Sequence, residues 1–181
     1  MLNNVKQGFV VVCAVAILSF VLMSCGGGQT EEQSFLQTDE YMNYTVPEGW
    51  SKMETGDAST LIMKDPEQFP YIAIYIESLN TYKGKVYESI DEFESEWEWV
   101  SNNKDIEQLS KRCETVNVDG RDVLFAEEVY KDSTDPDKTY ILRSYEKEID
   151  GCYYQISLET DDEKDLEAFD GFVNSIVFVG E

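Results

Sequence analysis

None of the 181 residues is histidine, and this restricts the chemistry that the other residues could carry out. A serine or cysteine nucleophile activated by histidine is therefore excluded, and so is the commonest metal ligand and proton shuttle near neutral pH. A serine–lysine pair is another route to a hydrolase, and the chain has two adjacent pairs, Ser51-Lys52 and Ser110-Lys111. Because neighbouring side chains on a strand point to opposite faces, neither is a natural dyad. We therefore expect no enzyme, with a histidine-free hydrolase as the weaker alternative.

Three aspartates in one polar segment are the second chemically capable group. Asp132, Asp135 and Asp137 offer the hard oxygen ligands that Ca²⁺ prefers. Their spacing departs from an EF-hand loop, which has glycine at its sixth position and glutamate at its twelfth. A solvated hairpin loop is the simpler interpretation, so we expect no metal and no other cofactor. Carboxylate-based Ca²⁺ binding remains an alternative function.

The four cysteines divide into two groups. Cys13 and Cys25 belong to the start of the chain, whereas Cys113 and Cys152 lie in its body. In an exported domain a disulfide between Cys113 and Cys152 can form and persist, and it would contribute about 4 kcal/mol through loop-closure entropy. Two buried free thiols on neighbouring strands are the alternative, because the sequence does not show whether the Cα atoms approach within about 7 Å. A redox role is not expected, since no Cys-x-x-Cys spacing is present.

The start of the chain predicts export. Residues 8–23 form an almost unbroken apolar run, which is shorter than the roughly 20 helical residues that span a bilayer and about as long as the hydrophobic region of a signal peptide. The run ends in Leu22-Met23-Ser24-Cys25, which resembles the lipobox of bacterial lipoproteins, although Met23 departs from the usual small or branched residue. The resemblance implies cleavage before Cys25 and diacylglycerol on its sulfur. An uncleaved anchor and an ordinary secretory signal are the alternatives.

Each of these interpretations places the remainder of the chain outside the cytoplasm. With acyl chains contributing about 0.8 kcal/mol per buried methylene, we expect lipid anchoring to the cell membrane or the outer membrane. Residues 1–24 are then the lipoprotein signal peptide, and residues 25–39, glycine-rich and then acidic, are a flexible tether. Residues 40–181 are the length of a single domain.

The charge balance restricts the partners. The chain has 14 lysines and arginines against 37 aspartates and glutamates, a formal net charge of −23. Nucleic acid is therefore not expected as a partner, because phosphate neutralisation needs basic side chains. Aromatic residues make up 13% of the chain, which is too many for a disordered acidic tail. We expect a folded domain with a tyrosine-rich or acidic surface.

The periodicity of the domain predicts an α+β fold. Two Asp-Gly pairs, 119–120 and 150–151, lie between β-like runs and predict tight hairpins. Residues 71–78 carry apolar side chains on both faces, which is typical of a central strand with layers above and below. Ser89 and Glu92 fit a capping box at the start of a helix. The expected strands cover about 41–46, 60–64, 71–78, 112–118, 121–130, 140–149 and 152–160, and the expected helices begin at 89 and 161.

Two short patches resemble a known family. Residues 44–50, YTVPEGW, resemble the Pro-x-Gly-Trp opening of PsbP-like proteins, and residues 169–176 resemble the final helix of that fold. The resemblance implies an α/β/α sandwich, in which helices pack on the faces of a largely antiparallel sheet of six to seven strands. It also implies a binding or assembly module without known catalysis. The metal-binding histidines of some plant members have no counterpart here.

Together these observations favour a membrane-anchored extracytoplasmic lipoprotein that binds a protein or another envelope component without catalysis. Trp99 lies off the apolar stripe of its expected helix and is a candidate contact residue, although an exposed tryptophan more often rests against a neighbouring loop. The ligand, the oligomeric state and the membrane that is used do not follow from the sequence.

Overall fold

The computed structural model describes residues 38–54, 59–65, 68–97 and 105–179. Cys25, most of the predicted tether and Trp99 lie outside these residues. Within them, no helix is long and apolar enough to cross a bilayer. The elements along the chain are α2 (Thr38–Tyr41), β1 (Met42–Asn43), β2 (Ser51–Glu54), β3 (Ser59–Asp65), β4 (Gln68–Ser78), α3 (Ile90–Glu96), β5 (Ile106–Val118), β6 (Arg121–Asp132), β7 (Asp135–Ile149), β8 (Cys152–Thr160), α4 (Glu163–Asn174) and β9 (Val177–Phe178).

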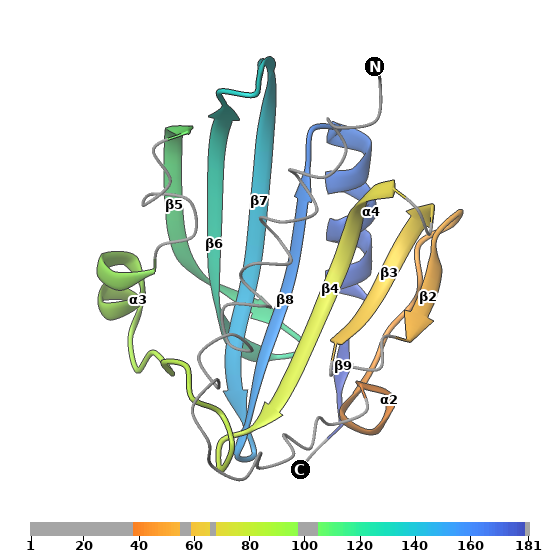
Figure 1. Cartoon of the computed structure of the whole chain (residues 1–181). Helices are drawn as coiled ribbons and strands as arrows, with labels where there is room; N and C mark the ends of the chain where they lie inside the picture. Colours follow the sequence, from red (N-terminus) through yellow and green to blue (C-terminus); the bar gives the residue numbers. More distant parts are fainter. Residues whose placement is uncertain (1–37, 55–58, 66–67, 98–104, 180–181) are drawn as a thin grey trace, which may run out of the picture. The chain divides into compact units, whose positions relative to one another are not determined.

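Seven strands form one sheet in the order β2-β3-β4-β8-β7-β6-β5 (Figure 1). Every neighbouring pair is antiparallel. Strand β8 inserts between β4 and β7, so that segments about 80 residues apart in sequence lie side by side at the centre. A second sheet consists of β1 and β9 alone. The predicted fold class, α+β with a largely antiparallel sheet, is confirmed.

Both predicted Asp-Gly hairpins are present. Asp119 and Gly120 have φ values of 50° and 75° between β5 and β6, and Asp150 and Gly151 have φ values of 50° and 78° between β7 and β8. Two consecutive positive φ values give a turn whose twist matches that of the flanking strands. The first turn places Val118 opposite Arg121 and sets the register of the β5–β6 ladder as far as Ser110, beyond which the register shifts by one residue.

Helix α4 covers one face of the sheet and builds the core. Its apolar stripe is buried as predicted, with Leu166, Phe169, Val173 and Ile176 at most 8% exposed. These side chains lie in one cluster with apolar residues of the central strands, namely Ile72, Ile74 and Ile76 of β4 and Tyr154, Ile156 and Leu158 of β8. Lys64 of β3 and Arg143 of β7 reach α4 through ion pairs with Asp165 at 2.5 Å and Asp170 at 2.6 Å.

Helix α3 lies against the opposite face. Ser89 accepts a hydrogen bond from the Glu92 backbone at 3.2 Å, which confirms the predicted N-cap. Trp97 at the other end donates its indole N–H to Glu146 of β7. The preceding residue, Tyr145, packs on Phe169 of α4, and consecutive strand residues point to opposite faces. The sheet therefore carries a helix on each face.

Several predicted boundaries need correction. The strand expected over 41–46 is reduced to the two residues of β1, because the strand that pairs with it, β9, is equally short and helix α2 precedes it. Thr38 and Asp39, predicted to be tether, belong to α2, where Thr38 is buried and bonds to Thr60. The loop expected over 132–138 is mostly strand, with Asp132 opposite Asp135.

Replacing Gly171 or Gly120 with alanine should change the stability in opposite directions. Gly171 lies inside α4 with no atom within 4 Å of an added Cβ, so Gly171→Ala should raise the free energy of unfolding by about 0.5–1 kcal/mol. Gly120 also has space, but its positive φ strains an L residue, and Gly120→Ala should lower stability by about 1 kcal/mol or more. Urea denaturation of both variants checks the pair. Equal signs would contradict this explanation.

Candidate functional site: a tyrosine–glutamate face

The face of the sheet opposite α4 carries buried carboxylates. Glu77, Glu128, Glu146 and Glu159 come from four adjacent strands and are 2%, 0%, 3% and 4% exposed. Tyrosine, tryptophan and glutamine side chains donate to them. We call this set the tyrosine–glutamate face and define it as Tyr75, Glu77, Gln108, Glu128, Tyr130, Ser144, Glu146, Tyr153, Gln155 and Glu159.

Cross-strand register brings these residues together. Glu77 of β4 lies opposite Tyr153 of β8, and Glu146 of β7 lies opposite Gln155 of β8. Side chains of one strand face project together at every second residue, so these four occupy a continuous stretch of the same face. Strand β8 runs between the two glutamates, and Tyr153 therefore stands between them.

Glu146 is held by four donors. Its Oε1 accepts from Trp97 Nε1 at 2.9 Å, from Gln155 Nε2 at 3.2 Å and from Ser144 Oγ at 3.3 Å, and its Oε2 accepts from the Tyr153 hydroxyl at 2.5 Å. Burial raises the pKa of Glu146 above its ordinary value of 4.5, and the hydrogen bonds oppose this shift without cancelling it. The group therefore holds its proton to a higher pH than an exposed glutamate.

Glu77 is less well satisfied. Its Oε2 accepts from the Tyr75 hydroxyl, but Oε1 is buried and has no hydrogen-bond partner among the residues that the structure describes. Within those residues, neither Glu77 nor Glu146 forms an ion pair with a lysine or arginine. A buried carboxylate oxygen without a donor costs about 1–3 kcal/mol or more, which makes this atom a conspicuous polar feature of the face.

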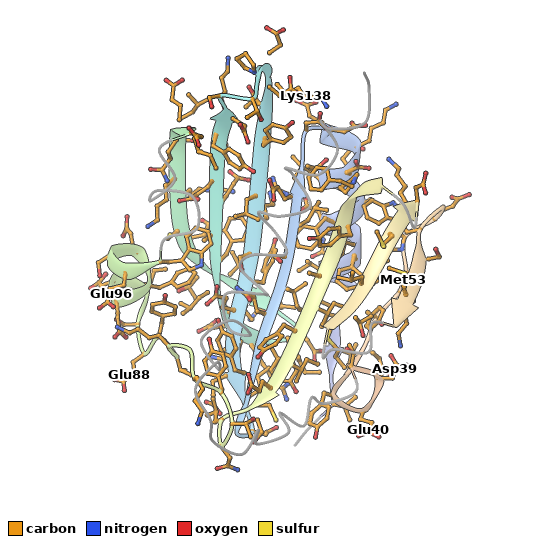
Figure 2. The ribbon with its side chains drawn as sticks, in the orientation of Figure 1. Asp39, Glu40, Met53, Glu88, Glu96 and Lys138 are labelled. Atoms are coloured by element: carbon orange, nitrogen blue, oxygen red, sulfur yellow. The ribbon has the colours of Figure 1, made fainter. Side chains whose placement is uncertain are left out.

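Aromatic rings cover the same region. Tyr82, from the irregular segment between β4 and α3, stacks on Tyr153 with ring centroids 4.2 Å apart and planes 22° from parallel. Burial, with the charges of Glu146 and Glu77 adding to it, raises the pKa of the Tyr82 hydroxyl to about 12. Both carboxylates are therefore close enough to act on the same ring. Figure 2 shows that the labelled Glu88 and Glu96 beside α3, in contrast, point away from the sheet.

The remaining two carboxylates continue the pattern along the sheet. Glu128 of β6 accepts from Gln108 Nε2 at 2.5 Å, and Glu159 of β8 accepts from the Tyr130 hydroxyl. Tyr130 in turn stacks on Tyr140 of β7, with centroids 5.6 Å apart. Neutral donors thus meet the carboxylates in each of these contacts.

Sequence reasoning missed this face. Tyr71, Ala73 and Tyr75 indicate an apolar second face for β4, and the glutamates of neighbouring strands look like ordinary solvated charges. The signal was present as tyrosines and glutamates recurring at period two, for example Tyr75 with Glu77. Recognising it requires the order of the strands, which no local pattern contains.

The candidate metal loop is not assembled as a cation site. Asp132 Oδ1 accepts from the backbone and the hydroxyl of Thr134 at 2.7 Å each, while Asp135 lies 4.0 Å from Lys138. In the ranges that the structure covers, no group of three or more aspartate, glutamate or cysteine side chains is arranged to hold a metal ion. Asp137 is exposed.

The two body cysteines do not form the proposed disulfide. Both thiols are free, and they lie on opposite faces of the sheet. Cys113 of β5 pairs with Ala126 of β6, which pairs with Ser144 of β7 on the same face as Glu146. Cys152 of β8 lies on the other face, in the core cluster with α4. Strands β6 and β7 separate β5 from β8. The alternative of thiols on neighbouring strands also needs this correction.

The two serine–lysine pairs do not form dyads, because consecutive strand residues point to opposite faces. Ser51 pairs with Met63 and Lys52 with Ile62, on opposite faces of β2, and Lys52 reaches Asp39 at 2.7 Å. On β5, Lys111 donates to the backbone carbonyls of Trp97 and Glu94. Neither lysine is directed to the adjacent serine as a base.

Comparison with known proteins concerns the fold. No protein-family model matches the chain, and no curated protein is similar to it in sequence. A protein from Bacteroides thetaiotaomicron, known from a crystal structure, shares the fold at a TM-score of 0.50 and 12% sequence identity. The match covers 77% of this chain but only 46% of the length of the Bacteroides protein.

Two further solved structures were found. One is PsbP from the cyanobacterium Synechocystis, with a TM-score of 0.49 and 14% sequence identity. The match covers 86% of this chain and 99% of the cyanobacterial chain. LpqN of Mycobacterium tuberculosis, described as involved in cell envelope biogenesis, has a TM-score of 0.48 and 11% identity, covering 77% and 83%.

Proposed function

We propose that the chain is an extracytoplasmic lipoprotein, tethered to a membrane through Cys25, whose domain is a non-catalytic binding module for a protein or another envelope component. The tyrosine–glutamate face carries the binding role. Its polar groups sit on the strands of a single sheet and are held in place by neighbouring side chains, as a recognition surface requires. The apolar run and Leu22-Met23-Ser24-Cys25 support the tether.

The same face supports binding over catalysis. Ser144 is the serine whose hydroxyl donates to Glu146, but it is completely buried. The oxygen that it meets already accepts from Trp97 and Gln155. A general base must have an accessible lone pair within reach of the proton that it removes, and this pair lacks one. No nucleophile and base can be named among the described residues.

Replacing Cys25 tests the tether. In a fractionated producing cell we expect the native chain in the membrane fraction, with its mass raised by acyl chains, and Cys25→Ala without the acyl mass and without stable acyl anchoring. Cys13→Ala, which also removes a cysteine from the start of the chain, is the matched control and should behave as the native protein. Unchanged mass and fractionation for Cys25→Ala, or native protein in the cytosol, would contradict the tether.

Capture from envelope extract tests the binding role. The Cys25→Ala chain should retain a defined component at moderate salt. Adding Gln155→Arg, which places a bulky charge on the tyrosine–glutamate face, should abolish that retention. An empty capture, or equal capture by both chains, would count against the face as the binding surface.

A further inference from the structure

We propose that Glu77, with the rings of Tyr82 and Tyr153, forms a binding site for a primary ammonium group. This inference rests on the proposed binding role and specifies the chemistry that the face recognises. It starts from Oε1 of Glu77, a buried carboxylate oxygen that no donor reaches among the described residues. The other oxygen is held by Tyr75, so the carboxylate is oriented and keeps one acceptor for a ligand.

The charge of the site selects a cation. Glu77 and Glu146 flank Tyr153 from adjacent strands, and no described lysine or arginine forms an ion pair with either carboxylate. An anion would meet the buried Glu77 carboxylate in a region of low dielectric, where like charges repel strongly. A charged donor would instead satisfy Oε1 with a hydrogen bond about twice as strong as a neutral one.

The surrounding groups distinguish ammonium from a divalent metal. Ca²⁺ takes six to eight oxygen ligands, whereas Glu77 and Glu146 are separated by a strand and no described trio of metal-ligating side chains exists. Four donors already occupy the oxygens of Glu146. The stacked rings of Tyr82 and Tyr153 add π-electron density, which attracts organic cations. One carboxylate oxygen and aromatic rings suit an ammonium with N–H donors.

Methylammonium chloride is the probe, added to the full chain in neutral detergent at constant ionic strength. We expect saturable heat in calorimetry and a change in tryptophan fluorescence, to which Trp97, hydrogen-bonded to Glu146, contributes. Glu77→Gln keeps the shape of the side chain and removes its charge, and it should weaken binding at least tenfold. Glu107→Gln removes an exposed carboxylate from β5 and should leave the affinity unchanged.

Thermal unfolding gives a second readout and shows that the variant is folded. Glu77→Gln should be at least as stable as the native chain without ligand, because it no longer buries a charge, and methylammonium should raise the unfolding temperature of the native chain alone. No saturable response to methylammonium, an equal response in Glu77→Gln, or an equal response to tetramethylammonium or Ca²⁺ would overturn the proposal. None of these outcomes changes the Cys25 fractionation, so the two proposals fail separately.

Discussion

Replacing Phe169 with alanine is expected to lower the free energy of unfolding by about 3–5 kcal/mol, the usual cost of deleting a fully buried aromatic side chain. Phe169 is 0% exposed and joins α4 to the sheet through an edge contact with Tyr145, at 5.7 Å between ring centroids. It also stacks near Phe172 of the same helix, at 6.4 Å. Removing the ring therefore leaves a cavity between helix and sheet.

Thermal and urea denaturation check this prediction. A single domain of this size should lose on the order of 10 °C in unfolding temperature, at about 2–4 °C per kcal/mol. Leu109→Ala is the matched control, because Leu109 is 47% exposed and its loss should change stability by no more than about 0.5 kcal/mol. Equal losses for the two variants would show that α4 is not part of the core.

Replacing Glu146 with alanine is expected to lower stability by about 3 kcal/mol or more, because it leaves three buried donors without this acceptor at about 1–3 kcal/mol each. These donors are the Trp97 indole, the Tyr153 hydroxyl and the Ser144 hydroxyl. Glu146→Gln should cost much less, since an amide oxygen can accept from Trp97 while the Tyr153 hydroxyl accepts from the amide nitrogen. Urea denaturation of the three chains at one pH gives the comparison.

The native chain and Glu146→Gln should differ in how their stability depends on pH. Because the pKa of Glu146 is raised by burial, the folded state binds more protons than the unfolded state between the ordinary pKa of 4.5 and the folded value. The contribution of Glu146 to stability is therefore complete below the ordinary pKa and is lost as pH rises toward the folded one. The stability of Glu146→Gln relative to the native chain should rise with pH across this window.

Denaturation at a series of pH values from about 4 upward measures the difference between the two chains, in which the titration of all other groups cancels to first approximation. A difference that stays constant with pH, or one that falls as pH rises, would show that burial does not raise the pKa of Glu146. A stable Glu146→Ala would show that Trp97 and Tyr153 find other acceptors.

Local patterns in the sequence determined much of the secondary structure. The Asp-Gly turns at 119–120 and 150–151, the Ser89 cap and the stripe of α4 all depend on residues within a few positions of one another. Backbone conformation and helical periodicity act over that range, so a single stretch of chain contains the whole cause. The α+β class follows from the same elements.

The tertiary structure alone decided the order of the strands and everything that depends on it. Placing β8 between β4 and β7 set Tyr153 between Glu77 and Glu146 and put Cys113 and Cys152 on opposite faces. A strand's own pattern shows which residues share a face, but the neighbour of that face is chosen by packing across the whole sheet. Glutamates at period two are solvated charges where the strand face meets water, and buried hydrogen-bond acceptors where it meets tyrosines. Only long-range pairing distinguishes the two cases.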